Sequence, residues 1–208
     1  IAEMARGTQR LSFWCLRTFG TRSPENMRIL LKTLIVPKLE YACLVWYPTD
    51  KANINLIESV QKTFTRKVRE FQEWNEEIGA WICTTDYWQR LNSLKIYSLQ
   101  RRRDRYLLLT LYKMIAGLLD PIGFRREDIR FSQRRKITIR RVLCRGRRKR
   151  RWVQTLRYNS FPAVAINAYN LMPDDLRIIF STVDTFKAGL DKWLETVPDE
   201  PDCHNQRT

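Results

Sequence analysis

The feature that most constrains the fold is the nearly apolar stretch ILLKTLIVPKLEYACLVW at residues 29–46, which carries a proline near its middle. A helix that spans a membrane needs about 20 consecutive apolar residues. Lys32, Lys38 and Glu40 fall inside this stretch, and each would be costly in hydrocarbon. The stretch therefore predicts a helix buried inside a soluble protein, and we expect no membrane partner.

The residues before this stretch have the pattern of a helix start. Ser23 suits the N-cap, Pro24 suits the first helical position, and Glu25 places an acid against the positive end of the helix dipole. Pro37 removes a backbone hydrogen bond and disfavours helical angles at Val36. We therefore expect a kinked helix or two helices in near-register. The helical stretch should end near Tyr47, with LEYACLVW in the core. The apolar positions recur at steps of three and four: Met27, Leu30, Leu31, Leu34, Ile35, Leu39, Ala42, Cys43 and Trp46.

A second helix is predicted to begin after Asp50, which suits its N-cap. Its charged positions lie mostly outside, so the two helices should pack antiparallel. Its apolar positions are Ile54, Ile57, Phe64, Val68 and Phe71.

A polar connection that contains tryptophans follows the second helix, and a third helical segment is predicted over residues 94–119. Its second half, YLLLTLYKMIAGLL, belongs in the core because it is apolar nearly all round.

Beyond Pro121 and Gly123 the pattern changes. Residues 136–142 alternate as a short, half-exposed strand does, and short helices are predicted at 161–170, 174–180 and 183–196.

The sequence thus predicts a mainly α protein, organised as an antiparallel helical bundle, a basic loop with a short β segment and a small C-terminal helical region. The expected segments are 1–120, 121–158, 159–197 and a flexible tail at 198–208.

Positive charge is concentrated in one part of the chain, whose formal net charge is +16. Residues 125–158 hold 15 Lys or Arg against 2 Asp or Glu, whereas residues 159–208 hold 4 against 8. Such a density repels itself unless an anion lies against it, so RRKITIRRVLCRGRRKRRW predicts contact with nucleic acid. A solvated surface strand, a nuclear localisation signal or an anionic membrane surface would account for the same pattern. Trp152 would stack on a base or anchor the loop to the core.

A second basic group, QRRRDR at residues 100–105, lies in the half of the third helix predicted to face solvent. Arg101 and Arg105 share a face of that helix. Phosphate contact and a plain solvated face both fit this pattern, and positive charge near a helix N-terminus opposes the dipole, which favours a functional reason.

No catalytic, metal or cofactor site is predicted. Asp174 and Asp175 fit the first turn of a short helix better than a two-metal site. His204, the single histidine, lies in the tail beside Cys203 without a second pair of zinc ligands, and no glycine-rich phosphate loop is present.

The five cysteines form no C-x-x-C pair, and their odd number argues against a disulfide framework. We therefore expect a reducing compartment, nuclear or cytoplasmic, and no secretion. Because the chain begins at Ile1 with no signal-like segment, we expect a piece of a longer polypeptide.

Several ordered motifs resemble the region that follows the polymerase palm in the reverse transcriptases of non-LTR retrotransposons of the long interspersed element type. RSPENMRILLKTLIVPKLEYACLVWYP is similar to the family pattern K-T-L-x-x-P-x-L-E-Y-A-x-x-V-W-x-P, and INLIESVQKTFTRKV to I-E-x-V-Q-x-x-x-T-R. YWQRLNSLKIYSLQRRRDRY, TLRYNSF, AYNLMPDDLR and VDTFKAGLDKWLETVPDEP resemble the later blocks. Tyr169 departs from the usual Trp or Phe before Asn170.

This resemblance implies the thumb and C-terminal region of an RNA-directed DNA polymerase, in which the bundle would be thumb-like. The catalytic aspartates of the palm would lie upstream of Ile1, so we expect no enzyme activity from the chain by itself. The implied partners are RNA, an RNA–DNA hybrid or DNA, and the upstream palm. The alternative is an inactive retrotransposon remnant, or a protein-interaction module that docked on the missing palm.

The residues predicted to contact nucleic acid are the basic side chains of the thumb-like face and of the two arginine groups. They are Lys32, Lys38, Arg66, Lys67, Arg101, Arg105, Arg134, Arg135, Lys136, Arg140, Arg141, Arg145, Arg147, Arg148, Lys149, Arg150 and Arg151.

Overall fold

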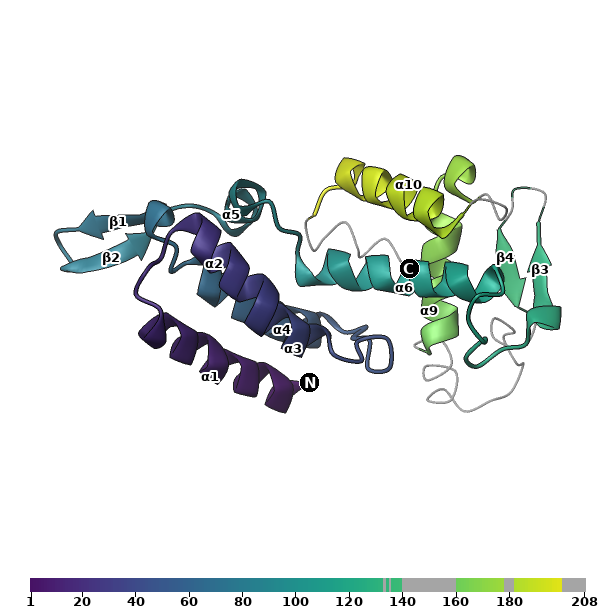
Figure 1. Cartoon of the computed structure of the whole chain (residues 1–208), viewed down its shortest axis with the longest axis horizontal. Coiled ribbons are helices and arrows are strands. Elements are labelled where there is room, and N and C mark those ends of the chain that lie inside the picture. The colour runs from purple at the N-terminus through teal and green to yellow at the C-terminus, as the bar shows by residue number, and fades with distance from the viewer. Residues whose placement is uncertain (133, 135, 140–159, 178–181, 200–208) are drawn as a thin grey trace. The chain divides into compact units, whose positions relative to one another are not determined.

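A computed structural model of the chain describes residues 1–132, 134, 136–139, 160–177 and 182–199. These residues are mainly helical, with two small antiparallel sheets, which confirms the predicted class (Figure 1). The chain divides into two compact units, Ile1–Arg103 and Asp104 onward, and the boundary falls inside helix α6. The four segments predicted from the sequence stay a prediction. Among the described helices, none has the length and apolar character needed to cross a membrane.

Helices and one hairpin make up the first unit. In chain order its elements are α1 (Ala2–Thr18), α2 (Pro24–Leu30), a π-helical turn (Leu31–Ile35), α3 (Val36–Glu40), α4 (Lys51–Thr65), a 3₁₀ turn (Arg69–Phe71), β1 (Gln72–Asn75), β2 (Ala80–Cys83), α5 (Tyr87–Leu94) and the start of α6 (Leu99–Ile115).

Helix α1 has no counterpart among the predicted helices, although it packs against α4 and α3. Two of its buried positions are the polar residues Thr8 and Ser12, so its buried face is not marked by hydropathy alone. The Thr8 hydroxyl donates to the carbonyl of Met4 (2.8 Å) and the Ser12 hydroxyl to that of Gln9 (2.7 Å), which satisfies both groups inside the helix.

The chain remains helical through Pro37. The N–H of Val36 donates to the carbonyl of Leu31, five residues back, and this π-helical turn leads directly into α3. Such a turn takes up the missing hydrogen bond and the bulk of the proline ring. Val36 itself keeps helical angles (φ −58°, ψ −45°), so the expectation that it leaves the helical region was wrong.

The predicted start of this helix is confirmed and its predicted end was wrong. The Ser23 hydroxyl accepts from the N–H of Asn26, and Pro24 occupies the first turn. The helix ends at Glu40, because Tyr41 turns to extended ψ and Ala42 adopts φ +51°. In LEYACLVW, Leu39 and Cys43 are buried, but Tyr41 and Val45 are 80% and 87% exposed.

The second helix begins as predicted, since the Asp50 carboxylate accepts from the N–H of Asn53 (2.9 Å). The polar connection after it is a β-hairpin, which the sequence interpretation missed. Strands β1 and β2 pair antiparallel with Trp74 opposite Trp81, their ring centroids 5.5 Å apart. Gly79 closes the turn at φ +62°, a conformation that favours glycine.

A buried carboxyl group joins three segments of the first unit. Glu58 of α4, which is 4% exposed, accepts from the Tyr87 hydroxyl at the start of α5 and from the N–H of Leu99 at the start of α6 (3.3 Å). The Gln61 amide, one turn further along α4, donates to the carbonyl of Tyr97 (3.1 Å). α4 therefore holds α5 and the start of α6 by polar contacts that lie far apart in sequence.

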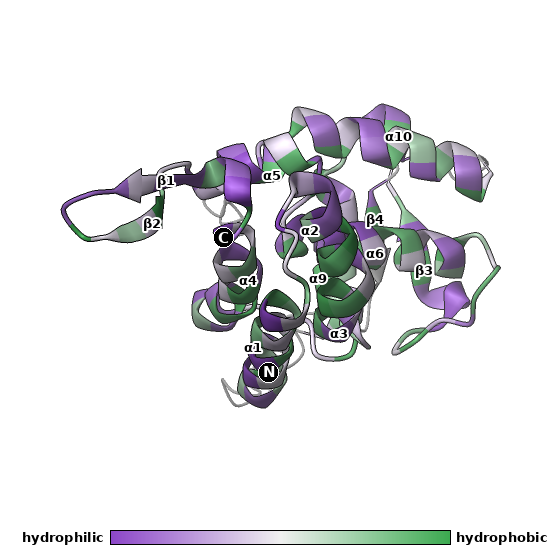
Figure 2. Cartoon of the chain, turned by 60° about the vertical axis from the view of Figure 1, so that its left-hand side comes forward, coloured by the Kyte–Doolittle hydropathy of each residue, from purple (hydrophilic) through white to green (hydrophobic). Residues whose placement is uncertain are grey.

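The second unit combines the rest of α6 with a 3₁₀ turn (Arg126–Asp128), strands β3 (Ile129–Phe131) and β4 (Ile137–Ile139), α9 (Phe161–Leu171), a 3₁₀ turn (Asp174–Leu176) and α10 (Val183–Thr196). β3 and β4 pair antiparallel. α9 is hydrophobic along most of its length and largely buried (Figure 2). The ring of Tyr112 stacks on that of Phe186 at 4.0 Å.

Asn170 ties α9 to the second sheet. Its side-chain oxygen accepts from the N–H of Ile137 (2.8 Å) and its amide donates to the carbonyl of Ile137 (2.9 Å). The preceding Tyr169 is 1% exposed and belongs to the core. In this Tyr-Asn pair, the ring therefore fills the core and the amide fixes a strand.

We predict that Glu58→Gln destabilises the protein by about 1–3 kcal/mol, because the Tyr87 hydroxyl and the N–H of Leu99 donate to one carboxyl oxygen, which an amide oxygen replaces as a weaker acceptor, and because the amide NH₂ must also be buried. Urea unfolding followed by circular dichroism measures the change. Glu70→Gln, which removes the same charge at an exposed position, is the control. Equal stability of the two variants would show that the contact carries no net stabilisation.

Candidate nucleic-acid interface

Of the basic residues predicted on the first unit, the four that precede α6 are accessible. Lys32, Lys38 and Arg66 are exposed and Lys67 is half-buried. Within the described ranges none of the four forms an ion pair with an acid. Arg66 and Lys67 directly follow the last residue of α4, where the negative end of the helix dipole favours cations.

The expectation that the arginines of α6 face solvent was wrong for Arg101 and Arg103, which are buried, whereas the side chains of Arg102 and Arg105 are 29% and 21% exposed. Arg101 is 5% exposed, with its guanidinium 5.3 Å from the ring centroid of Tyr97. Arg105 is bound through two hydrogen bonds by Asp191 of α10. The prediction that Arg101 and Arg105 contact nucleic acid stays a prediction, but these contacts give both side chains a structural role.

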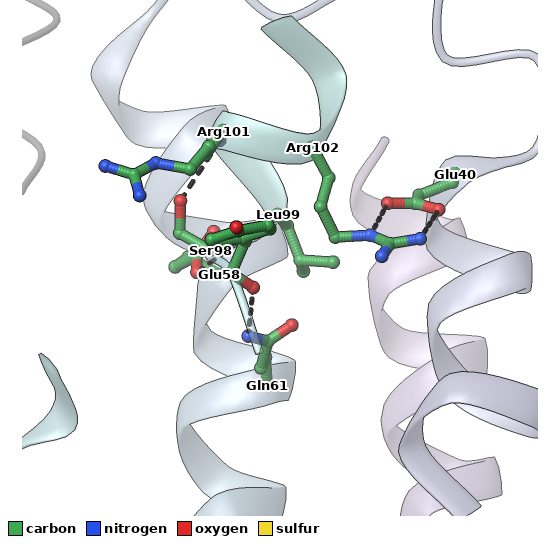
Figure 3. A network of polar contacts seen from close by, with 8 residues as sticks. Glu40, Glu58, Gln61, Ser98, Leu99, Arg101 and Arg102 are labelled. Atoms are coloured by element: carbon green, nitrogen blue, oxygen red, sulfur yellow. Dashed lines mark hydrogen bonds and ion pairs between the residues drawn. The ribbon is translucent and has the colours of Figure 1, made fainter. Parts of the chain in front are cut away.

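Arg102 and Arg103, between these two residues in α6, also donate hydrogen bonds within the fold. Arg102 donates two hydrogen bonds to Glu40 (2.5 and 2.9 Å), as Figure 3 shows, and Arg103, which is fully buried, donates to Gln100 (2.9 Å). The Glu58 carboxylate lies at the first N–H of the same helix. Glu40 and Asp191 therefore balance the charge of Arg102 and Arg105, and this pairing gives both arginines a structural role that does not require nucleic acid.

Most of the long basic segment lies outside the described residues. Of the predicted contacts in it, Arg134 and Lys136 are described, and both are exposed beside β4. The strand prediction is confirmed for Ile137–Ile139, and β3 is the partner that it lacked. The other predicted contacts and Trp152 lie outside the described residues. These contacts are Arg135, Arg140, Arg141, Arg145, Arg147, Arg148, Lys149, Arg150 and Arg151.

The residues considered for catalysis are placed as follows. Asp174 and Asp175 begin a 3₁₀ turn that ends at Leu176, where the first turn of a short helix over residues 174–180 was predicted, and Asp174 forms an ion pair with Arg177. In the described ranges no group of three or more His, Cys, Asp or Glu could hold a metal ion. Burial raises the pKa of the Cys15 and Cys43 thiols, which disfavours the reactive thiolate. Cys203 and His204 lie outside the described residues.

One cavity of the first unit combines positive charge with aromatic rings. Its volume is about 580 Å³, and α4, β2 and α5 supply most of its walls. The cationic lining residues are Lys62, Arg66, Lys67 and Arg90, and the aromatic ones are Trp81, Tyr87 and Trp88. Of the predicted contacts, Arg66 and Lys67 line this cavity, whereas Lys32 and Lys38 do not.

The inner wall of the cavity is held by fixed contacts. Arg90, which is 3% exposed, donates from Nε to the Thr65 hydroxyl (3.3 Å) and from Nη1 to the carbonyl of Thr85 (2.5 Å). Nζ of Lys62 lies 5.1 Å from the ring centroid of Tyr87. The sequence analysis missed Lys62, Trp81 and Trp88 as site residues. The one sequence signal for Lys62 was its spacing of one helical turn from Arg66, which places the two side chains on the same helix face.

The chain was compared with protein-family models, with curated proteins and with solved structures, and nothing matches in any of the three.

We predict that the Arg105–Asp191 pair stabilises the protein only above acidic pH. The hydrogen bond from Arg105 lowers the pKa of Asp191. A carboxyl whose pKa is lower in the folded state contributes fully above its unfolded value of about 3.9, and the contribution disappears as pH falls through the folded pKa. Because the Asp191 side chain is 36% exposed, we expect under about 1 kcal/mol.

The measurement is the urea midpoint of Asp191→Asn and of the unsubstituted chain from neutral to strongly acidic pH. We expect a deficit at neutral pH that closes in acid. Asp120→Asn, at an exposed position, is the control. A deficit of constant size across this range would contradict the prediction.

Proposed function

We propose that the chain is a non-catalytic nucleic-acid-binding region that holds RNA, an RNA–DNA hybrid or DNA mainly through phosphates. The observation that carries this proposal is the excess of 15 Lys or Arg over 2 Asp or Glu within residues 125–158. The rest of the chain does not offset this excess, since residues 1–124 carry a formal net charge of +7 and residues 159–208 one of −4.

The proposal is supported by a difference between two groups of basic residues, those with partners inside the fold and those exposed without an acidic partner. The arginines of α6 lie against Glu40, Asp191, Gln100 and Tyr97. The exposed cations of the first unit and those beside β4 have no such acidic partner in the described part of the chain. Accessible cations of this kind bind phosphate, which carries no sequence information, so weak sequence preference is expected.

The resemblance to the region after the palm of non-LTR reverse transcriptases extends the proposal. In that setting the helices of the first unit would be the thumb of an RNA-directed DNA polymerase, and the bound molecule would be its template and primer. The motifs quoted above support this extension, and a mainly helical first unit is compatible with it.

A second function is favoured by a separate observation on α1. Phe13, Trp14 and Phe19 are 47%, 54% and 41% exposed, and the rings of Trp14 and Phe19 lie edge to face. Exposed aromatic residues that lie together are typical of a protein contact. We propose as the alternative that this face docks on an upstream palm.

We predict that affinity for an RNA–DNA hybrid falls steeply with salt. With roughly six phosphate contacts the decrease is on the order of a thousandfold between about 50 and 200 mM salt. Replacing Arg147, Arg148, Lys149, Arg150 and Arg151 by Ala should remove most of this binding, as measured by fluorescence anisotropy with single-stranded RNA, the hybrid and duplex DNA.

The control removes the same charge from exposed positions elsewhere, by Ala at Arg6, Arg10, Arg17, Lys51 and Lys113. The proposal requires that this control binds more tightly than the variant at residues 147–151. Equal affinity of the two variants would make the binding a property of net charge alone.

The docking alternative predicts that the chain alone self-associates and that Phe13→Ser/Trp14→Ser reduces this, because an exposed apolar face is removed. Sedimentation of both proteins measures it. Added palm protein should dissolve the self-associated chain and should not affect the variant. A monomeric chain that ignores the palm would exclude this alternative.

A further inference from the structure

One side of the cavity of the first unit is lined by cationic side chains that form no ion pair with an acid within the described residues. Lys62, Arg66 and Lys67 contribute three cationic side chains from the last turn of α4 and the residues after it. The one acid in the lining is Asp86, whose carboxylate accepts from the N–H of Trp88 (3.0 Å) as the N-cap of α5. The net charge of the lining is positive, and its acid is already engaged.

The same cavity has aromatic surface left open. Trp81 is 43% exposed, although a tryptophan ring gains most from full burial. The Arg69 guanidinium lies 3.5 Å from its ring centroid, an arrangement that holds the ring in place. Trp88, half-buried, lies edge to face with the buried ring of Tyr87 at 4.8 Å. Two fixed indoles therefore border a space in which three cations converge.

We propose that this cavity binds one nucleotide unit of a single strand. The base packs against the indoles of Trp81 and Trp88, and its phosphate is bound by Lys62, Arg66 and Lys67. The volume of about 580 Å³ lies within the range of about 300–1,000 Å³ typical of small-molecule sites. A base stacked inside a duplex cannot enter, so the site selects unpaired nucleotides. This inference rests on the proposed function and adds a base contact to phosphate binding.

The test compares strands with and without bases. The full chain is titrated with a labelled oligouridylate and with an abasic strand of the same length. Trp81→Leu and Trp88→Leu should each weaken oligouridylate binding roughly tenfold and leave abasic binding unchanged, because only the base contact is removed. Arg66→Glu/Lys67→Glu should weaken binding of both strands.

Each variant has a matched control. Trp74→Leu removes the same cross-strand tryptophan pair as Trp81→Leu but does not change the lining of the cavity. Arg10→Glu/Arg17→Glu reverses two exposed charges on α1 and matches the net charge of the double variant at α4. Circular dichroism establishes that each variant is folded before it is titrated.

The outcomes separate this inference from the proposed function. If Trp81→Leu and Trp88→Leu bind oligouridylate as Trp74→Leu does, the nucleotide site is wrong while phosphate binding stands. If the chain binds uridine monophosphate better than inorganic phosphate but has no salt-steep affinity for strands, the site stands and the proposed function is wrong. If polyglutamate competes as well as oligouridylate, the cavity recognises charge only and the inference is overturned.

Discussion

The buried carboxylate of Glu58 is the interaction on which the first unit depends. It accepts from a side chain of α5 and from the first N–H of α6, so one group of α4 sets the start of two later helices. A carboxyl group that is 4% exposed is stable only with such donors, since burying a polar group without hydrogen bonds costs several kcal/mol. Tyr87 lines the cavity, so its contact with Glu58 positions the wall that α5 contributes to the candidate site.

Ion pairs inside the fold change the interpretation of the many arginines in this sequence. The basic run of α6 looks like a binding surface in the sequence, yet Arg102 lies against Glu40 and Arg105 against Asp191. Bidentate pairs of this geometry fix the guanidinium plane and join segments that are distant in sequence. Positive charge is therefore of two kinds in this chain. Some basic side chains form ion pairs within the fold, and others are exposed and accessible to anions.

The features that local sequence decides could be predicted. The caps at Ser23 and Asp50 depend on neighbours within three residues, and both are present. The burial of Arg101 could not be predicted, because it depends on contacts made only after the helices meet. The conformation of Val36 before Pro37 was predicted wrongly, since a proline is compatible with either a break or a π-helical turn. The cavity draws residues from a helix, a hairpin and a second helix, and no spacing rule connects them.

The helix dipole alone does not explain the cavity. Cations at the end of α4 are stabilised there in any protein, by about 0.3–1 kcal/mol each, so Lys62 and Arg66 by themselves indicate nothing about function. The dipole gives no reason for tryptophans of β2 and α5 to border the same space. Burying both rings in the core would have been more stabilising, at about 25 cal/mol for each Å² of apolar surface. Stability of the fold does not account for the partial exposure of Trp81 and Trp88 beside three cations. Binding of a ligand with both an aromatic ring and a phosphate accounts for it.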